Sequence, residues 1–356
     1  MAIVPSALFV ILAFAAAAGQ EKIADLKLGP AQEIGREKML FASIASVCED
    51  DRLHFYVLDR MEYAVHKFSP EGRRLAKFGR KGQGPGDFQS PGQIVFTSGR
   101  ELAVLEDLYY VSFLKTDGTF IRRLDLNGRL GLGYIGPDRY YGWVWRPEDQ
   151  QQLMVDAGNE ILRTFHTLAK GLFSVDLPDE TGRRVMFNYS HDAYVPRFLY
   201  AHGGHVSAIG ISDRYEIELL DERGQTVATL RRNLKPPGLS GRERDFLKRE
   251  LREFAESKGW PERVARELGK KIPSHKNMIR AVRISPRHVF AFRFPADISA
   301  ERAPSPADVF TPKGEFLGTT EFPDIPLFIS AGTAYFVKTD AGGDLYLLRR
   351  SYSLGF

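Results

Sequence analysis

The sequence predicts an all-β fold, a six-bladed β-propeller, for three reasons. The phrase around Asp59, YVLDRMEYAVHKFSPEGRRLAKF, returns around Glu106 as AVLEDLYYVSFLKTDGTFIRRL, with an offset of about 46 residues. Repeats of 40–50 residues that consist of short strands are typical of propellers. Five glycine turns then separate alternating apolar runs, and the C-terminal strands need a partner from the N-terminus. Five hairpins and one composite blade together predict six blades.

Each of the five turns ends on a glycine, which tolerates the positive φ that tight hairpins require. They are Ser69-Pro70-Glu71-Gly72, Thr116-Asp117-Gly118, Leu168-Ala169-Lys170-Gly171, Asp221-Glu222-Arg223-Gly224 and Thr311-Pro312-Lys313-Gly314. A strand-like run follows every one of these turns, for example LFSVDL after Gly171. We therefore expect each turn to be the outer hairpin of one blade.

The last blade has three strand-like runs, at residues 325–329, 334–339 and 345–352, and no fourth. Residues 23–34 can supply the missing strand. An open ring would leave sheet edges unpaired, and joining the two ends of the chain in one blade removes those edges. The sequence therefore predicts that the N-terminal strand closes the ring.

The long interval between Gly224 and Gly314 indicates an insertion at about residues 240–271. Ser240 and Glu243 have the spacing of a capping box, in which each caps the other's backbone N–H. An apolar stripe at helical spacing follows, consisting of Phe246, Leu247, Leu251, Phe254 and Ala255. Gly259 ends this helix and Pro261 can begin a second one. We expect two helices outside the ring, packed on the side of the propeller through this stripe.

Residues 1–19 have the pattern of a signal peptide, with an apolar run at 7–18 that ends in small residues. The alternative is a buried or anchoring N-terminal helix. Residues 20–356 then form the propeller, with no membrane span in the mature chain. The formal charge of +4 is interspersed along the sequence, which argues against nucleic acid as a partner. A single cysteine, Cys48, permits no intrachain disulfide. We expect a monomer that is periplasmic or extracellular.

The stretch FYVLDRMEYAVHKFSPEGRRLAKFGRKGQGPGDFQSPGQI resembles the repeat of bacterial NHL-like six-bladed propeller proteins. Asp87 stands where that repeat more commonly has Glu. The segment that ends in ADVFTPKGEFLGTTEFP is similar to the fifth blade of the family, and the segment that begins YEIELLDERGQTVATL is similar to the strands before its helical insertion. The resemblance implies the fold and a secreted protein, many of whose relatives have no assigned activity.

Candidate ligand-binding residues lie in loops and at strand ends, where propellers place function. They are Asp59, Arg80, Lys81, Gln83, Asp107 and Arg146. The glycine-rich loop at 79–88 lacks the helix that a phosphate loop needs, so we interpret it as a connection between blades. Arg146 follows the tryptophans Trp143 and Trp145, for which core packing is favoured over a sugar or peptide platform.

Candidate metal ligands are His191, His202 and His205, with Asp192 beside the first. Imidazoles with a carboxylate can hold zinc or another divalent ion, although this spacing matches no established signature. The alternative is a solvated polar turn. Six-bladed relatives include zinc-dependent lyases and calcium-dependent lactonases, whose ligands come from several blades. The resemblance thus allows a divalent metal, but the sequence requires no cofactor.

These observations favour a non-catalytic binding or scaffold module that uses one rim of the propeller. Its partner would be a protein, a peptide or a polar small molecule. The alternative is a metal-dependent hydrolase or lyase at the mouth of the central channel, and a third is a ligand sensor. The sequence does not decide whether the protein is an enzyme. It contains neither G-x-S-x-G nor H-E-x-x-H, and we interpret Cys48 as a packing residue.

We predict cleavage close to Ala18 or Gly19, because the apolar run gives way there to small residues and then to charge. Mass spectrometry of the exported protein should find a chain that begins within a few residues of Gln20. An exported chain that still begins at Met1 would refute the signal-peptide assignment.

Overall fold

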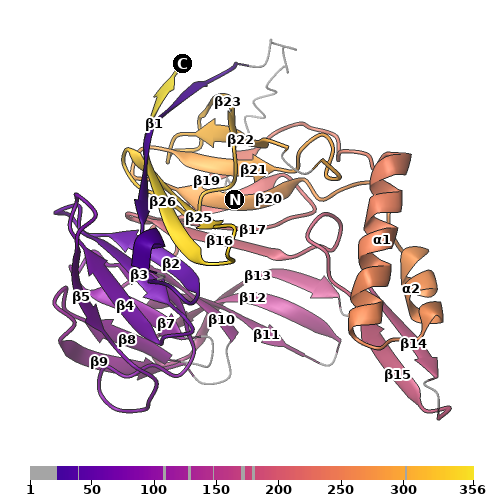
Figure 1. Ribbon diagram of the computed structural model, residues 1–356, viewed down its shortest axis with the longest axis horizontal. Coiled ribbons are helices and arrows are strands. Elements are labelled where there is room, and N and C mark those ends of the chain that lie inside the picture. Colours follow the sequence, from indigo (N-terminus) through magenta and orange to yellow (C-terminus); the bar gives the residue numbers. More distant parts are fainter. Residues whose placement is uncertain are drawn as a thin grey trace, which may run out of the picture.

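The computed structural model describes residues 22–38, 40–106, 110–126, 130–146, 148–169, 173–178, 181–300 and 303–356. This part of the chain contains six four-stranded antiparallel sheets, arranged as the blades of a ring with two helices beside it (Figure 1). The prediction of a six-bladed β-propeller is therefore confirmed. The predicted signal peptide lies outside the described residues.

Five blades use four strands in chain order, with the first strand innermost. Blades 1 and 2 consist of β2(Ile44–Glu49), β3(Phe55–Asp59), β4(Ala64–Phe68) and β5(Arg74–Phe78), and of β6(Pro91–Phe96), β7(Leu102–Glu106), β8(Tyr110–Leu114) and β9(Phe120–Asp125). Blades 3 and 4 consist of β10(Leu130–Gly136), β11(Arg139–Trp145), β12(Asp149–Asp156) and β13(Ile161–Ala169), and of β16(Phe198–Gly203), β17(Val206–Ile211), β18(Glu216–Leu220) and β19(Thr226–Arg231). Blade 5 consists of β20(Ile279–Ile284), β21(Val289–Arg293), β22(Ser305–Phe310) and β23(Phe316–Phe322).

Blade 6 joins the two ends of the chain. It comprises β24(Phe328–Ile329), β25(Thr333–Thr339), β26(Leu345–Gly355) and, as its outer strand, β1(Asp25–Ile34). The pairing of β1 with β26 runs from Asp25 opposite Gly355 to Ile34 opposite Leu347. A single 3-10 turn, Arg36–Lys38, follows β1. The predicted closure by the N-terminal strand is confirmed.

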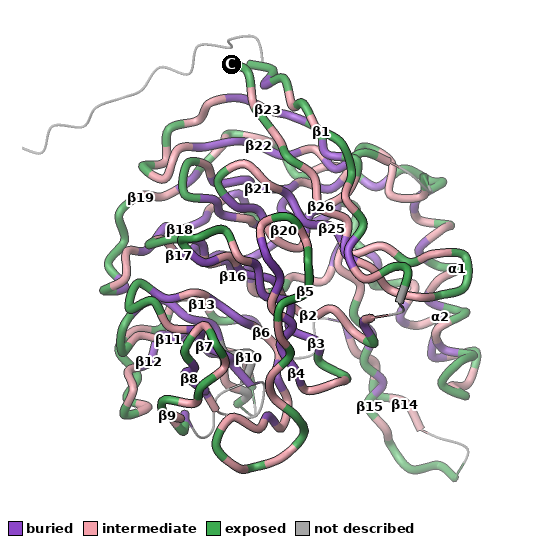
Figure 2. The backbone as a smooth tube through the Cα atoms, turned by 60° about the vertical axis from the view of Figure 1, so that its left-hand side comes forward, coloured by how far each residue is buried: buried purple, intermediate pink, exposed green. Residues whose placement is uncertain are grey.

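The interior strands are buried because neighbouring blades pack against both faces of each sheet. Every residue of β3 and β7 is buried, whereas the residues of the outer strands β5 and β9 are exposed or half-buried (Figure 2). Tyr56 and Leu58 of blade 1, for example, pack in one cluster with Ile94 and Val104 of blade 2. Apolar runs without strict alternation are expected for strands covered on two sides.

Four of the five glycine turns join the third and fourth strands of a blade, as predicted, with φ of 87° at Gly72, 90° at Gly118, 75° at Gly224 and 88° at Gly314. The third prediction is wrong. Blade 3 turns earlier, between β12 and β13, where Asn159 has φ 67° and Asp156 Oδ1 accepts the Glu160 N–H at 2.8 Å. Leu168 and Ala169 belong to β13, and Lys170 and Gly171 lie outside the described residues.

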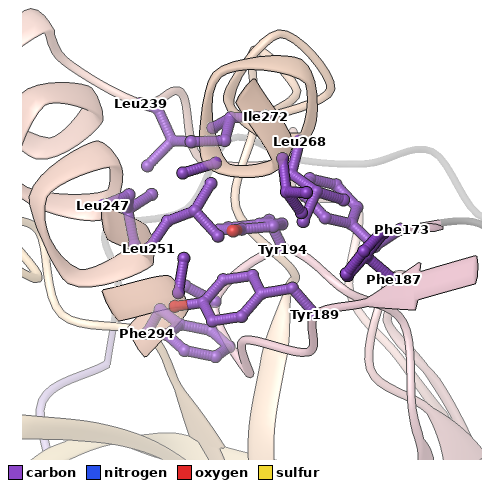
Figure 3. Close-up of a cluster of buried hydrophobic side chains, with 14 residues drawn as sticks. Phe173, Phe187, Tyr189, Tyr194, Leu239, Leu247, Leu251, Leu268, Ile272 and Phe294 are labelled. Carbon is purple, nitrogen blue, oxygen red and sulfur yellow. The ribbon is translucent and has the colours of Figure 1, made fainter. Parts of the chain in front are cut away.

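The insertion forms the two predicted helices, α1(Gly241–Ser257) and α2(Glu262–Gly269), and α1 begins with the predicted capping box of Ser240 and Glu243. Their apolar stripe packs differently from the prediction. It meets a separate hairpin, β14(Ser174–Pro178) and β15(Arg184–Asn188), and the chain that follows it. The shared core contains Phe173, Phe187, Tyr189, Ala193, Tyr194, Leu239, Leu247, Leu251, Ala255, Val264, Ala265, Leu268, Ile272 and Phe294 (Figure 3). The run assigned to a blade thus belongs to this lateral unit.

A chain that begins at Arg36 should be much less stable than one that begins at Lys22. It lacks β1, which leaves the edge of β26 unpaired and removes Ile34 from its cluster with Phe41 and Tyr335. Burial of one such side chain contributes about 2 kcal/mol, and the lost strand pairing adds to this. Thermal unfolding by circular dichroism measures the effect. Equal midpoints for the two chains would contradict closure by β1.

Candidate ligand-binding cleft

The ring has two faces, at the two ends of its inner strands. We call the face where each inner strand begins the top face, and the face where it ends the bottom face. The strand order places Asp59, Arg80, Lys81, Gln83, Arg146 and His191 on the top face. His202, near the end of β16, and His205 just after it lie on the bottom face. Asp107 lies outside the described residues.

Asp59 is fully buried and holds the backbone of the top face together. Its Oδ2 accepts the N–H of Ala42 at 2.7 Å, and its Oδ1 accepts those of Ser43, Met61 and Glu62 at 3.0–3.1 Å. Both carboxylate oxygens are therefore used within the fold, and Asp59 has a structural role.

The same arrangement recurs in other blades. Glu106, at the end of β7, accepts the N–H groups of Gln89 and Ser90 before β6. Ser212 Oγ accepts the N–H of Arg197 before β16 at 2.9 Å. In each case a side chain at the end of the second strand, or directly after it, holds the connection that leads into the inner strand. This explains why an acidic residue returns with the sequence repeat.

The glycine-rich loop is a connection between β5 and β6, as predicted. Its basic residues contact neighbouring side chains of the protein. Arg80 Nε pairs with Asp87 Oδ1 at 2.9 Å. Lys81 Nζ lies 5.4 Å from the centre of the Tyr63 ring. Arg146 donates its backbone N–H to Asp149 in the turn between β11 and β12. These contacts place the predicted residues on the rim without bringing them into one site.

The three candidate histidines do not form one metal site, because β16 separates His191 from the other two. His191 Nδ1 accepts the Ala193 N–H at 3.1 Å, so its Nε2 carries the proton and donates to Glu250 Oε2 at 3.0 Å. His205 pairs with Glu222 at 3.2 Å in an exposed turn. His191 is therefore a link between the ring and α1.

A different group has the spacing of metal ligands. Asp59, Glu62 and His66 offer atoms within 4.8 Å of one another. However, Lys77 Nζ lies 2.8 Å from Glu62 Oε2, which also meets His66 Nε2 at 2.9 Å. The oxygens of Asp59 accept backbone N–H groups, and Glu62 already contacts the ammonium of Lys77 and the ring nitrogen of His66. The three side chains therefore have partners within the protein.

A cleft of about 800 Å³ lies on the top face, between α1 and blades 5 and 6. Its lining comes from α1, the connection before β16, the start of β20, the turn between β21 and β22, and blade 6. The lining residues are His191, Asp192, Ala193, Phe246, Glu250, Arg280, Phe294, Pro295, Ile298, Ala300, Ala303, Pro304, Ser305, Pro323, Asp324 and Lys338. This volume lies in the range of small-molecule and peptide sites.

The charged side chains of the cleft are paired with one another. Arg280 Nε lies 3.3 Å from Asp192 Oδ2, and Lys338 Nζ lies 2.9 Å from Asp324 Oδ2. The third pair is His191 with Glu250. Apolar side chains, among them Phe246 and Ile298, lie between these pairs. The cleft therefore offers both signs of charge and an apolar surface.

One buried ion pair holds α1 against the ring and so forms the cleft. Lys276 Nζ lies 2.6 Å from Glu243 Oε1, and both side chains are at most 2 % exposed. Lys276 also donates to the carbonyls of Pro295 and Ala296 at 3.1 and 2.8 Å. Glu243 Oε1 accepts the Ile298 N–H, and its Oε2 caps Ser240. Glu243, which belongs to the capping box of α1, thus also fixes the turn between β21 and β22 of blade 5.

Sequence reasoning missed the cleft and the residues that define it. The capping box identified Glu243, but its partner Lys276 follows 33 residues later, in a segment without a motif. Arg280, Asp324 and Lys338 come from different blades, and no pattern in one segment connects them. The only usable signal was the polar run SHKN before β20, which stands between two apolar elements.

Comparisons with known proteins support the fold. No family model matches the chain, and no curated protein matches it. A Bacteroides fragilis protein whose name classes it as a suspected exported protein aligns over 93% of this chain and 96% of its own, with 11% identity and a TM-score of 0.54. A member of the DUF4221 family from Bacteroides vulgatus aligns over 94% and 99%, with 12% identity and a TM-score of 0.52. At these identities the likeness shows the fold alone.

The helices of the described residues are too short or too polar to cross a bilayer.

The buried ion pair should make the stability of the helical insertion depend on pH in the acid range. Burial alone would raise the pKa of Glu243, but hydrogen bonds from Lys276 and from the backbone of Ser240 and Ile298 outweigh it and lower the pKa from 4.5 to about 2. A carboxylate with a lowered pKa stabilises the fold fully above pH 4.5, and the stabilisation disappears as the pH falls toward 2. Hydrogen exchange in α1 should therefore accelerate over this interval.

At pH 7, Lys276→Met should destabilise the insertion by about 3–5 kcal/mol, because Glu243 would remain buried without a counter-charge. Glu243→Gln should in addition flatten the acid dependence. Glu253→Gln, on an exposed position of the same helix, is the matched control and should behave like the parent chain. Unchanged hydrogen exchange in α1 of the Lys276→Met variant would contradict the stabilising role of the Glu243–Lys276 ion pair.

Proposed function

We propose that the chain is an exported propeller that binds a peptide or a polar small molecule in the top-face cleft without transforming it. The observation that carries this proposal is the composition of the cleft, in which paired charges of both signs surround apolar side chains. A ligand with both an ammonium and a carboxylate, or with alternating peptide dipoles, matches such a surface. A strongly charged ligand of one sign does not.

The arrangement of the titratable groups supports a binding role. A general acid or base needs a group that can exchange a proton with the substrate. In the described cleft, Asp192 pairs with Arg280, Asp324 pairs with Lys338, and His191 has a partner at each ring nitrogen. The binding energy of a ligand would come mainly from the apolar walls, and the ion pairs would orient it.

The proposal that the protein is exported rests on the predicted signal peptide and on the name of the Bacteroides fragilis neighbour. The NHL-like resemblance belongs to the proposal in the same way, since it agrees with a secreted propeller. Cleavage after residues 1–19 would leave β1 at the beginning of the mature chain, where the closure of the ring requires it.

The cleft can be tested with a library of di- and tripeptides, screened by ligand-observed NMR against the mature chain. We expect hits with an apolar side chain beside a charged terminus. Phe246→Ala and Lys338→Gln should each weaken these hits by about tenfold, the effect of one lost contact of roughly 1.4 kcal/mol. Val227→Ala, at an exposed position of β19, is the control and should change nothing.

Hits that are insensitive to both cleft variants would contradict the proposal, as would a library without hits. Metal analysis of the same purified protein addresses the alternative of a metal-dependent hydrolase or lyase. A stoichiometric divalent ion that is lost in the His202→Ala/His205→Ala variant would favour that alternative.

A further inference from the structure

A separate pocket of about 400 Å³ lies on the bottom face, between blades 1 and 2. Its lining comes from the turn after β2, the end of β4, the end of β6 with the turn that follows, and the turn after β8. The lining residues are Asp50, Asp51, Arg52, His54, Lys67, Phe96, Arg100 and Thr116, and none of them lines the top-face cleft. By the volume of a liquid water molecule, about 30 Å³, the pocket has room for about a dozen non-hydrogen atoms.

A buried carboxylate fixes the orientation of His54 at this pocket. Asp50 Oδ1 accepts the backbone N–H groups of Arg52 and His54, both at 2.9 Å. Asp50 Oδ2 accepts the hydroxyl of Tyr56 at 2.9 Å and lies 3.2 Å from His54 Nδ1. A carboxylate only accepts hydrogen bonds, so Nδ1 carries the proton of the neutral ring. His54 Nε2 is then a hydrogen-bond acceptor.

This acceptor is accessible to a ligand. The His54 side chain is 24% exposed, and its Nε2 makes no hydrogen bond with any residue that the structure describes. The Nε2 atom of His202, in contrast, is buried without a partner, whereas that of His54 is not enclosed in this way. A molecule in the pocket can therefore donate a hydrogen bond to His54.

Lys67 supplies the matching donor. Its Nζ donates to the carbonyl of Thr116 at 2.9 Å and lies 5.5 Å from the centre of the Tyr56 ring. An ammonium group has three protons to donate, and this hydrogen bond uses one of them. Lys67 forms no ion pair with a carboxylate in the described part of the chain. Two of its N–H donors therefore remain for a ligand.

The carboxylates of the pocket are engaged by the protein itself. Asp51 pairs with Arg100, and each oxygen of Asp50 already meets two donors. The lining as a whole has three basic side chains and two acidic ones, so it presents no strong charge of either sign. Phe96 adds an apolar surface to the wall. Such a pocket suits a neutral ligand that has hydrogen-bond donors and acceptors around an apolar frame.

We propose that this pocket binds a neutral sugar. A hydroxyl group both donates and accepts hydrogen bonds, so sugar hydroxyls donate to His54 Nε2 and accept from Lys67 Nζ. The apolar face of the sugar ring packs against Phe96. A monosaccharide has about a dozen non-hydrogen atoms, which agrees with the volume of the pocket. The proposal does not rest on the top-face cleft, because the two cavities share no lining residue.

Ligand-observed NMR titration with the methyl glycosides of glucose, galactose and mannose tests this proposal. At least one of them should bind. The fully O-methylated form of that sugar keeps the ring and its acceptors but has no hydroxyl to donate, so it should bind about tenfold more weakly. An absence of binding by all three sugars would overturn the proposal, and so would equal affinity for the methylated form. Tighter binding of glucuronate than of every neutral sugar would show recognition of a charge and would also overturn it.

Variants assign the binding to this pocket. His54→Phe and Lys67→Met should each weaken the sugar by about tenfold, because each removes one hydrogen bond to it. The matched controls are His205→Phe and Lys115→Met, at exposed positions in other turns of the bottom face, and they should bind like the parent chain. Thermal midpoints verify that each variant is folded. Lys67 makes no hydrogen bond with Asp50, so Lys67→Met tests the site even if the loss of His54 destabilises its turn. Unchanged affinity of folded Lys67→Met would refute the site.

Discussion

The ion pair between Glu243 and Lys276 is the interaction on which the functional face depends. Two fully buried charges are stable only if further hydrogen bonds compensate their loss of hydration. Here the N-terminus of α1 and the turn of blade 5 donate such bonds to Glu243, and Lys276, in the chain that leads into β20, donates to two carbonyls of the same turn. An apolar pair of the same size would bury the same area but would not fix these three segments relative to one another. The pair thus converts a lateral insertion into a wall of the cleft.

The charges of the top-face cleft are balanced within the protein itself. In the top-face cleft, each described charge has a partner across the surface, so an empty cleft is electrostatically satisfied and a ligand competes with existing pairs. Broad, weak recognition suits such a cleft.

The sequence predicted what depends on local rules and missed what depends on distant contacts. Gly72 and Gly118 must adopt positive φ, and Ser240 must cap a helix, so these elements were evident from short segments. The hairpin at 174–188 was misassigned because LFSVDL reads as an outer strand, and only its packing on α1 and α2 distinguishes the two. Asp59 was expected to bind a ligand because it stands at a strand end, where propellers place function. Its four backbone partners become visible only when the blade is assembled. The cleft residues Arg280, Asp324 and Lys338 lie in separate segments, and no single segment indicates that they meet.

The pairing of the first strand with the last imposes an order on biogenesis. β1 is synthesised before any blade, yet its partner β26 follows more than 300 residues later, so the ring cannot close until the whole chain is available. Contacts of such long sequence separation are slow to form. A ribosome, or a translocation pore that delivers the N-terminus first, would therefore release a chain whose opening segment is still extended and unpaired. During that delay the hydrogen-bonding edge of β1 is open, and an unpaired strand edge can pair with another chain.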